Sequence, residues 1–170
     1  MSLKCLWVIA AVLVLSATPL RSQTNNPFGG FKHDNTQPIE ITSDSLEVRQ
    51  AEELAIFTGE VVAGQGTLRL TADKLEVFYK QKQGSETGAI RNIKASGNVF
   101  LSNGAETAKG AKAEYDVVTG LVRMYGNVVL TQGENAIAGD TLFIDLNKGT
   151  GRIEAAGNGR VKSIFTPSSN

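Results

Sequence analysis

The stretch Gly59-Glu-Val-Val-Ala-Gly-Gln-Gly66 decides the fold, because the chain repeats it twice more without a gap. The further copies are Gly97-Asn-Val-Phe-Leu-Ser-Asn-Gly104 and Gly126-Asn-Val-Val-Leu-Thr-Gln-Gly133, and a partial copy begins at Gly157. Each full copy opens with glycine, then Glu or Asn, then valine, and has a second glycine seven residues after the first. Repetition at such a spacing predicts a fold of similar units stacked side by side.

Apolar residues alternate with polar ones further along each repeat unit, after the glycine-bounded copy. The alternating residues are Leu75, Val77 and Tyr79 in the first copy, Ala113, Tyr115 and Val117 in the second, and Leu142, Ile144 and Leu146 in the third. A period of two is typical of β-strands with one buried face, and the chain after residue 36 has no helical window of useful length. We therefore expect strands that bend at the glycines, where the backbone needs a positive φ.

Two architectures fit this pattern: a β-solenoid, and an antiparallel jellyroll whose strand pairs stack along an axis. Both would bury one apolar row and leave unpaired strand edges at both ends. The units begin at residues 59, 97, 126 and 157, so the first step of 38 residues exceeds the later steps of 29 and 31. A polar insertion at residues 80–88, which we interpret as hairpin-like, accounts for the longer step.

The N-terminus has the features of a secretory signal. Lys4 supplies a positive charge, residues 5–15 are apolar, and small residues lead to a cleavage position near Ser22, with Ala17 as the other candidate. An apolar run of 11 residues is too short to span a bilayer. The predicted organisation is a signal peptide at 1–22, a flexible leader at 23–36, a β-domain at 37–166 and a tail at 167–170.

Charge and cysteine content exclude several kinds of protein. The whole chain has 17 basic and 17 acidic residues, and loss of Lys4 and Arg21 with the signal leaves 15 against 17, a formal charge of −2. A nucleic-acid binder would show a basic excess. Cys5 leaves with the signal, so the mature chain has no cysteine for a disulfide.

No residue pattern points to catalysis, a metal or a cofactor. Asp44, Asp73 and Asp140 recur at one position of the repeat, as Asp116 and Asp145 do at another. Recurrence indicates structural corners, whereas a catalytic pair would break the repeat. The single histidine, His33, lies in the leader and cannot serve as a base for a serine nucleophile. We expect no enzyme; a polysaccharide-active β-helix would need exposed aromatic residues, and the mature chain has no tryptophan.

The apolar row has two interpretations. It can be an ordinary packed core, with Glu76 and Glu114 between its members and facing solvent. Alternatively, a jellyroll that opens along its axis can receive acyl chains on the same row, since each buried CH₂ contributes roughly 0.8 kcal/mol.

The order of these motifs resembles the LptA/OstA family of lipopolysaccharide export proteins. The resemblance rests on Gln37-Pro-Ile-Glu-Ile-Thr-Ser-Asp44, Phe57-Thr-Gly-Glu-Val61, Gly66-Thr-Leu-Arg-Leu-Thr-Ala-Asp-Lys-Leu75, Tyr115-Asp116, Gly126-Asn-Val128, Gly139-Asp140, Gly159-Arg-Val161 and Thr166-Pro-Ser168. It covers residues 37–168, although residues 80–97 align poorly. It implies an all-β fold, an open and slightly twisted β-jellyroll built of stacked strand pairs.

The resemblance also implies a function in the periplasm of a Gram-negative bacterium. Such a protein binds the lipid A part of lipopolysaccharide, stacks head to tail with copies of itself, and joins the jellyroll domains of inner- and outer-membrane partners. The lipid-contacting positions that it implies are Ile39, Ile41, Tyr115 and Val117, with Val77, Leu142 and Ile144 following by repeat equivalence. A structural or adhesive β-repeat module without lipid remains the alternative.

Overall fold

The computed structural model describes residues 31, 36–80 and 88–166. Apart from a short 3₁₀ helix, η2 (Gln50–Glu52), its regular elements are strands of one antiparallel sheet, as the all-β prediction requires. Antiparallel pairing excludes the β-solenoid, whose strands run parallel. The strands are β1 (Glu40–Thr42), β2 (Ser45–Arg49), β3 (Leu54–Gln65), β4 (Leu68–Lys80), β5 (Ala89–Ser102), β6 (Glu106–Asp116), β7 (Leu121–Gln132), β8 (Asn135–Asp145), β9 (Thr150–Glu154) and β10 (Lys162–Ile164).

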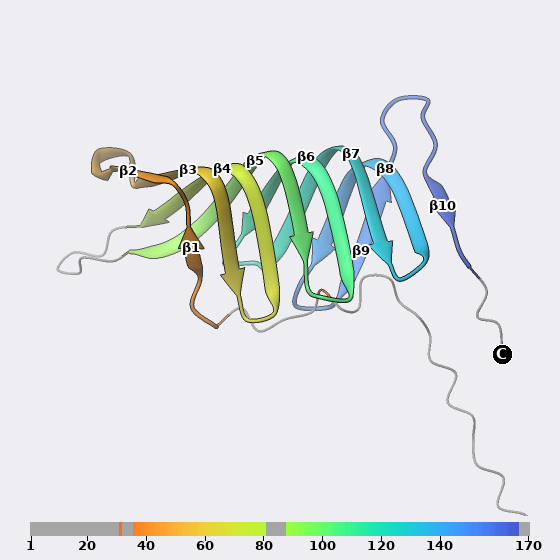
Figure 1. Cartoon of the computed structure of the whole chain (residues 1–170), viewed down its shortest axis with the longest axis horizontal. Coiled ribbons are helices and arrows are strands. Elements are labelled where there is room, and N and C mark those ends of the chain that lie inside the picture. Colours follow the sequence, from red (N-terminus) through yellow and green to blue (C-terminus); the bar gives the residue numbers. More distant parts are fainter. Residues whose placement is uncertain (1–30, 32–35, 81–87, 167–170) are drawn as a thin grey trace, which may run out of the picture.

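The sheet bends back on itself to form two facing walls (Figure 1). Each of the long strands β3 to β8 bends near its middle and continues from one wall into the other, and the pairing register shifts at this point. The first wall contains β2, one half of each long strand, and β9. The second wall contains β1, the other halves, and β10. The result is an open roll rather than a closed barrel.

The repeated Gly-(Glu/Asn) pairs make the bends. Gly97 has φ +77° and Asn98 has φ +46°, so two successive residues are in the left-handed region, and Gly59 and Gly126 start equivalent bends. A side-chain carbon at Gly97 would collide with the Asp73 carboxylate, which accepts a hydrogen bond from the Asn98 amide at 2.9 Å. The recurrent aspartates therefore lie at corners, as predicted.

The other recurrent aspartates hold hairpin turns. The Asp116 carboxylate accepts a hydrogen bond from the Thr119 amide at 2.9 Å. Asp145 accepts from the amides of Asn147 and Lys148, and its ion pair with Lys148 lowers the pKa of its carboxyl. These are the short connections of the first wall.

The core lies between the walls. Its large, fully buried side chains on the strands are Val61, Leu75, Val99, Leu101, Met124, Val128, Leu130, Leu142 and Ile144. Alternate residues face outward, as expected for Glu76 and Glu114, which lie on the outer face. The inward alternation predicted for the repeats is therefore observed.

Several predicted segments lie outside the described residues. These are the signal peptide, most of the leader including His33, residues 81–87 of the insertion, and the tail at 167–170. In the part of the chain that the structure describes, no helix is long and apolar enough to span a membrane.

Replacement of Gly97 by alanine should lower the free energy of unfolding by about 3 kcal/mol. Alanine at this position is strained in the left-handed conformation, and its methyl group collides with Asp73 at the bend. Gly133→Ala is the matched control, because Gly133 also has a positive φ of 57° but nothing lies near its missing Cβ. We expect that control to lose about 1 kcal/mol. Equal losses in urea unfolding of the two variants would show that the Asp73 contact does not constrain the bend.

Candidate functional site

The inner face of the roll is uncovered at the end formed by β1 and β2. Leu46 pairs with Phe57 and Val48 with Ala55, which places all four side chains on the inner face. Yet Leu46 is 55% and Val48 54% exposed. Apolar side chains that belong to the interior row therefore face an opening, which we call the mouth.

The mouth contains a hollow of about 410 Å³. Its lining residues are Ile39, Ile41, Val48, Gln50, Ala55, Phe57, Val77, Tyr79, Gly88 and Ile90. These come from β1, β2, β3, β4 and the start of β5, so several segments far apart in sequence converge there. The lining is largely aliphatic and aromatic, which suits hydrocarbon rather than a polar ligand.

A smaller cavity lies deeper between the walls. Its volume is about 40 Å³, and its lining includes Ile39, Leu68, Leu70, Ile93, Leu101, Tyr115 and Val122. Ile39 lines both spaces and so lies at the junction of the mouth and the interior. A cavity of this size has room for a few water molecules but is far too small for an acyl chain. The two walls therefore lie close together at this point.

The predicted lipid-contacting residues fall into two groups. Ile39, Ile41 and Val77 line the mouth, and Tyr115 lines the interior cavity with Ile39. The remaining three lie elsewhere on the inner face: Val117 is half-buried against the core, and Leu142 and Ile144 are fully buried further along the roll.

A buried polar contact crosses the interior beside the cavity. The Tyr115 hydroxyl donates a hydrogen bond to Gln65 Oε1 at 3.1 Å, and Gln65 Nε2 donates to the backbone carbonyl of Gln37 at 2.9 Å. Burial, the larger cause, and the nearby charge of Asp116 raise the pKa of the Tyr115 phenol, so it stays protonated and able to donate. Tyr115 belongs to the first wall and Gln65 to the second. No pattern in the sequence predicts this contact.

A second hollow of about 450 Å³ lies on the outer face near β7, β8 and β9. Arg123 and Arg152 both lie over the Phe143 ring, at 4.9 and 4.7 Å from its centre. Arg152 pairs with Glu154, and Arg123 donates a hydrogen bond to the Tyr125 hydroxyl. These contacts hold both guanidinium groups against the outer face of the sheet.

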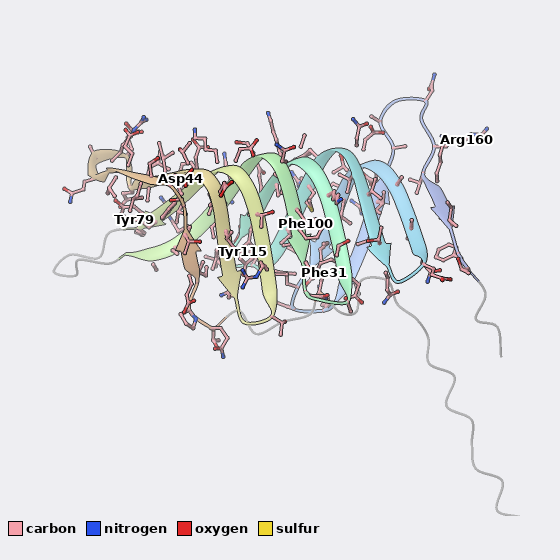
Figure 2. The ribbon with its side chains drawn as sticks, viewed as in Figure 1. Phe31, Asp44, Tyr79, Phe100, Tyr115 and Arg160 are labelled. Carbon is pink, nitrogen blue, oxygen red and sulfur yellow. The ribbon has the colours of Figure 1, made fainter. Side chains whose placement is uncertain are left out.

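Phe31 is a buried residue that sequence analysis missed. It falls within the predicted flexible leader, but its side chain is fully buried in the core cluster between the walls (Figure 2). The available signal was a pair of phenylalanines, Phe28 and Phe31, in an otherwise polar and glycine-rich segment.

The two ends of the roll are free strand edges. At one end β1 and β2 cover different halves of β3, and at the other β10 and β9 cover different halves of β8. Ile164 and Phe165 are exposed at the second end, as Leu46 and Val48 are at the first. Among the described residues, no group of three or more His, Cys, Asp or Glu side chains could hold a metal ion.

Comparisons with known proteins agree with this geometry. The family described as "LptA/(LptD N-terminal domain) LPS transport protein" matches residues 40–150. An uncharacterized protein of Rhizobium meliloti is 38% identical over 165 residues, covering 95% of this chain and 88% of that protein. The lipopolysaccharide export system protein LptA of Haemophilus influenzae is 27% identical over 144 residues, covering 81% of this chain and 82% of that protein.

A solved structure also resembles the roll. It is LptH, the LptA-homologous periplasmic component of the lipopolysaccharide transport device of Pseudomonas aeruginosa. The TM-score is 0.67 at 20% identity, and the match covers 79% of this chain and 99% of that one. This similarity confirms the open β-jellyroll that the family resemblance implies.

Replacement of Phe31 by alanine should lower the free energy of unfolding by about 3 kcal/mol, because a fully buried aromatic side chain is lost from the core. Phe165→Ala is the control, since Phe165 is exposed, and its effect should stay within about 0.5 kcal/mol. Thermal or urea unfolding of the mature chain measures both. A loss below 1 kcal/mol for Phe31→Ala would show that Phe31 adds little to the folded domain.

Proposed function

Because the chain belongs to the LptA/LptD N-terminal domain family of lipopolysaccharide transport proteins, we propose that it is a periplasmic bridge that carries lipopolysaccharide from the inner to the outer membrane. The acyl chains of the lipid A part bind the inner face of the roll, and the glycan stays in water. The observation that carries this proposal is the mouth, an apolar hollow that opens at a free end of the roll. The predicted signal peptide supports export to the periplasm.

The chemistry of the mouth supports binding of acyl chains. Leu46 and Val48 leave apolar surface exposed there, although burial of such surface contributes about 25 cal/mol per Å². Hydrocarbon from a ligand would cover it. A lipid with several acyl chains would gain roughly 0.8 kcal/mol for each CH₂ it buries, so partial insertion is sufficient for binding. The proposed role is transport without catalysis.

Strand addition at both ends would extend the inner face from one molecule to the next. Each wall has eight strands that alternate in direction, so β9 of one copy would lie antiparallel to β2 of the next copy, and β10 antiparallel to β1. The alternation therefore continues without interruption through a head-to-tail stack. The same edges would receive the jellyroll domains of the inner- and outer-membrane partners.

Charge on the outer face favours the head-to-tail arrangement. One row of paired residues crosses the first wall from Glu47 on β2 to Arg152 on β9. In a stack that keeps this register, Arg152 of one copy faces Glu47 of the next. Arg49 holds the pKa of the Glu47 carboxyl below its usual value through a hydrogen bond and its charge, so Glu47 is ionised at neutral pH. Head-to-head pairing would instead bring two Glu47 side chains together.

A structural module without lipid is the second candidate, and the small interior cavity favours it. A photo-crosslinker at Ile41, and separately at Val117, in cells that make lipopolysaccharide distinguishes the two. A covalent adduct with lipopolysaccharide supports the carrier. With a folded, exported protein and no adduct at either site, the structural module would be the better description.

Charging the inner face should abolish lipid binding. Ile41→Asp and Val117→Asp each place a carboxylate where acyl chains would lie, at a cost of several kcal/mol. Val118→Asp is the matched control, because Val118 is 75% exposed and should bind as the wild type does. Fluorescently labelled lipopolysaccharide measures binding, and circular dichroism checks that each variant is folded. Binding retained in both inner-face variants would contradict the proposal.

Reversing one edge charge should weaken self-association about threefold, and reversing both should restore it. Glu47→Arg and Arg152→Glu each bring like charges together between copies, whereas the double variant recreates a pair of opposite charges. The expected change is small because an exposed ion pair contributes about 0.2–1 kcal/mol. Sedimentation of the mature chain over a concentration series measures the association constant. If the double variant is weaker than both single variants, β2 and β9 do not meet in this register.

A further inference from the structure

The Tyr115–Gln65 contact lies between the walls, beside the small interior cavity. The mouth holds a hollow of about 410 Å³, but the cavity behind it is only about 40 Å³. For an acyl chain to extend from the mouth into the interior, the walls would have to separate at this point. Tyr115 and Gln65 both line the small cavity, and their side chains join opposite walls.

The same contact fixes the segment that leads into β1. Gln65 uses its carbonyl oxygen to accept from Tyr115 and its amide to donate to the Gln37 backbone carbonyl. Ile39, which lines both spaces, lies two residues after Gln37, and β1 itself pairs with β3 over three residues only. The Gln65 side chain therefore adds to the short β1–β3 pairing in positioning this edge.

We propose that the Tyr115–Gln65–Gln37 chain of hydrogen bonds is a latch that keeps the two walls together when no lipid is bound, and that acyl chains open it to pass from the mouth into the interior. The proposal rests on the proposed lipid-carrying function. Opening lets water or lipid reach Gln65 and frees Ile39 to move away from the junction. In the closed state the latch prevents apolar walls from remaining open to water.

The latch is weak, but it discriminates between hydrocarbon and small polar solutes. A buried hydrogen bond between neutral groups contributes only a modest net stability, so arriving hydrocarbon can replace it by covering apolar wall. A small polar solute offers no such compensation. The contact therefore permits opening by an acyl chain and opposes opening by solvent alone.

Tyr115→Phe is the variant that tests the latch, because it removes the hydroxyl and keeps the ring. Tyr125→Phe is the matched control, since the Tyr125 hydroxyl bonds Arg123 and Glu114 on the outer face. In the lipid-free mature chain, hydrogen exchange of the Ile41 and Ala63 amides should become about tenfold faster in Tyr115→Phe, because Gln65 Oε1 is left buried without this donor. Exchange in β9 and β10, at the other end of the roll, should not change.

A second variant and a binding measurement complete the test. Gln65→Met should accelerate the same amides at least as much, because it removes the hydrogen bonds to both Tyr115 and Gln37. Adding Tyr115→Phe to Gln65→Met should have little further effect, because the bond that Tyr115→Phe removes is already lost. Association of fluorescently labelled lipopolysaccharide should be about tenfold faster with Tyr115→Phe and unchanged with Tyr125→Phe.

The outcomes separate the latch from the proposed function. Unchanged exchange at Ile41 and Ala63, or equal acceleration at every amide, would overturn the latch whatever happens with lipid. Local acceleration without faster lipid association would overturn its role as a gate. Absence of lipopolysaccharide binding to the wild-type chain would overturn the proposed function, while local acceleration would still support the closed-state hydrogen bonds.

Discussion

The left-handed bend is the constraint on which the roll depends. Each long strand has to leave one wall and enter the other, and at β3, β5 and β7 the chain does so with a glycine of φ near +80° followed by a second left-handed residue. Neither conformation is favourable for an ordinary L-residue, so the sequence must supply Gly and then, at two of the three bends, Asn. Asp44, between β1 and β2, and Asp73, on β4, occupy the space that a side chain at the glycine would need. Without a bend at the same height in successive strands, the two walls could not face each other.

Much of this was predictable because the bends repeat. The Gly-(Glu/Asn)-Val motif marked the bends, and the period of two placed Val77, Tyr115 and Ile144 on the inner face, where the structure has them. The corner aspartates followed from the same recurrence. Local sequence determines these features, since a positive φ and an alternating strand are properties of a few adjacent residues.

The features that escaped prediction depend on distant parts of the chain. Gln65 reads as one more polar residue near a turn, yet it is buried because Tyr115, fifty residues later, faces it across the interior. Phe31 lies in a polar stretch of sequence, and its burial depends on core residues that come from distant strands. Leu46 and Val48 have the inward alternation of buried residues but are exposed, because β2 is at the end of the sheet and has no neighbour to cover them. Periodicity shows which way a side chain points and does not show whether anything lies opposite.

The difference between the two free edges has a consequence for size control. In the proposed stack, the interface would join unlike surfaces, β9 and β10 of one copy against β1 and β2 of the next, and would be heterologous: each addition would consume one edge and present an identical new one. If the rotation between copies does not close a ring, such an interface sets no limit on the number of copies. A two-fold dimer, in contrast, uses up its interface once two copies have joined. Filament length would then be set from outside, by the concentration of the chain and by whichever proteins terminate the two ends. The distance to be spanned, rather than the sequence of the subunit, would determine how many copies make up the assembly.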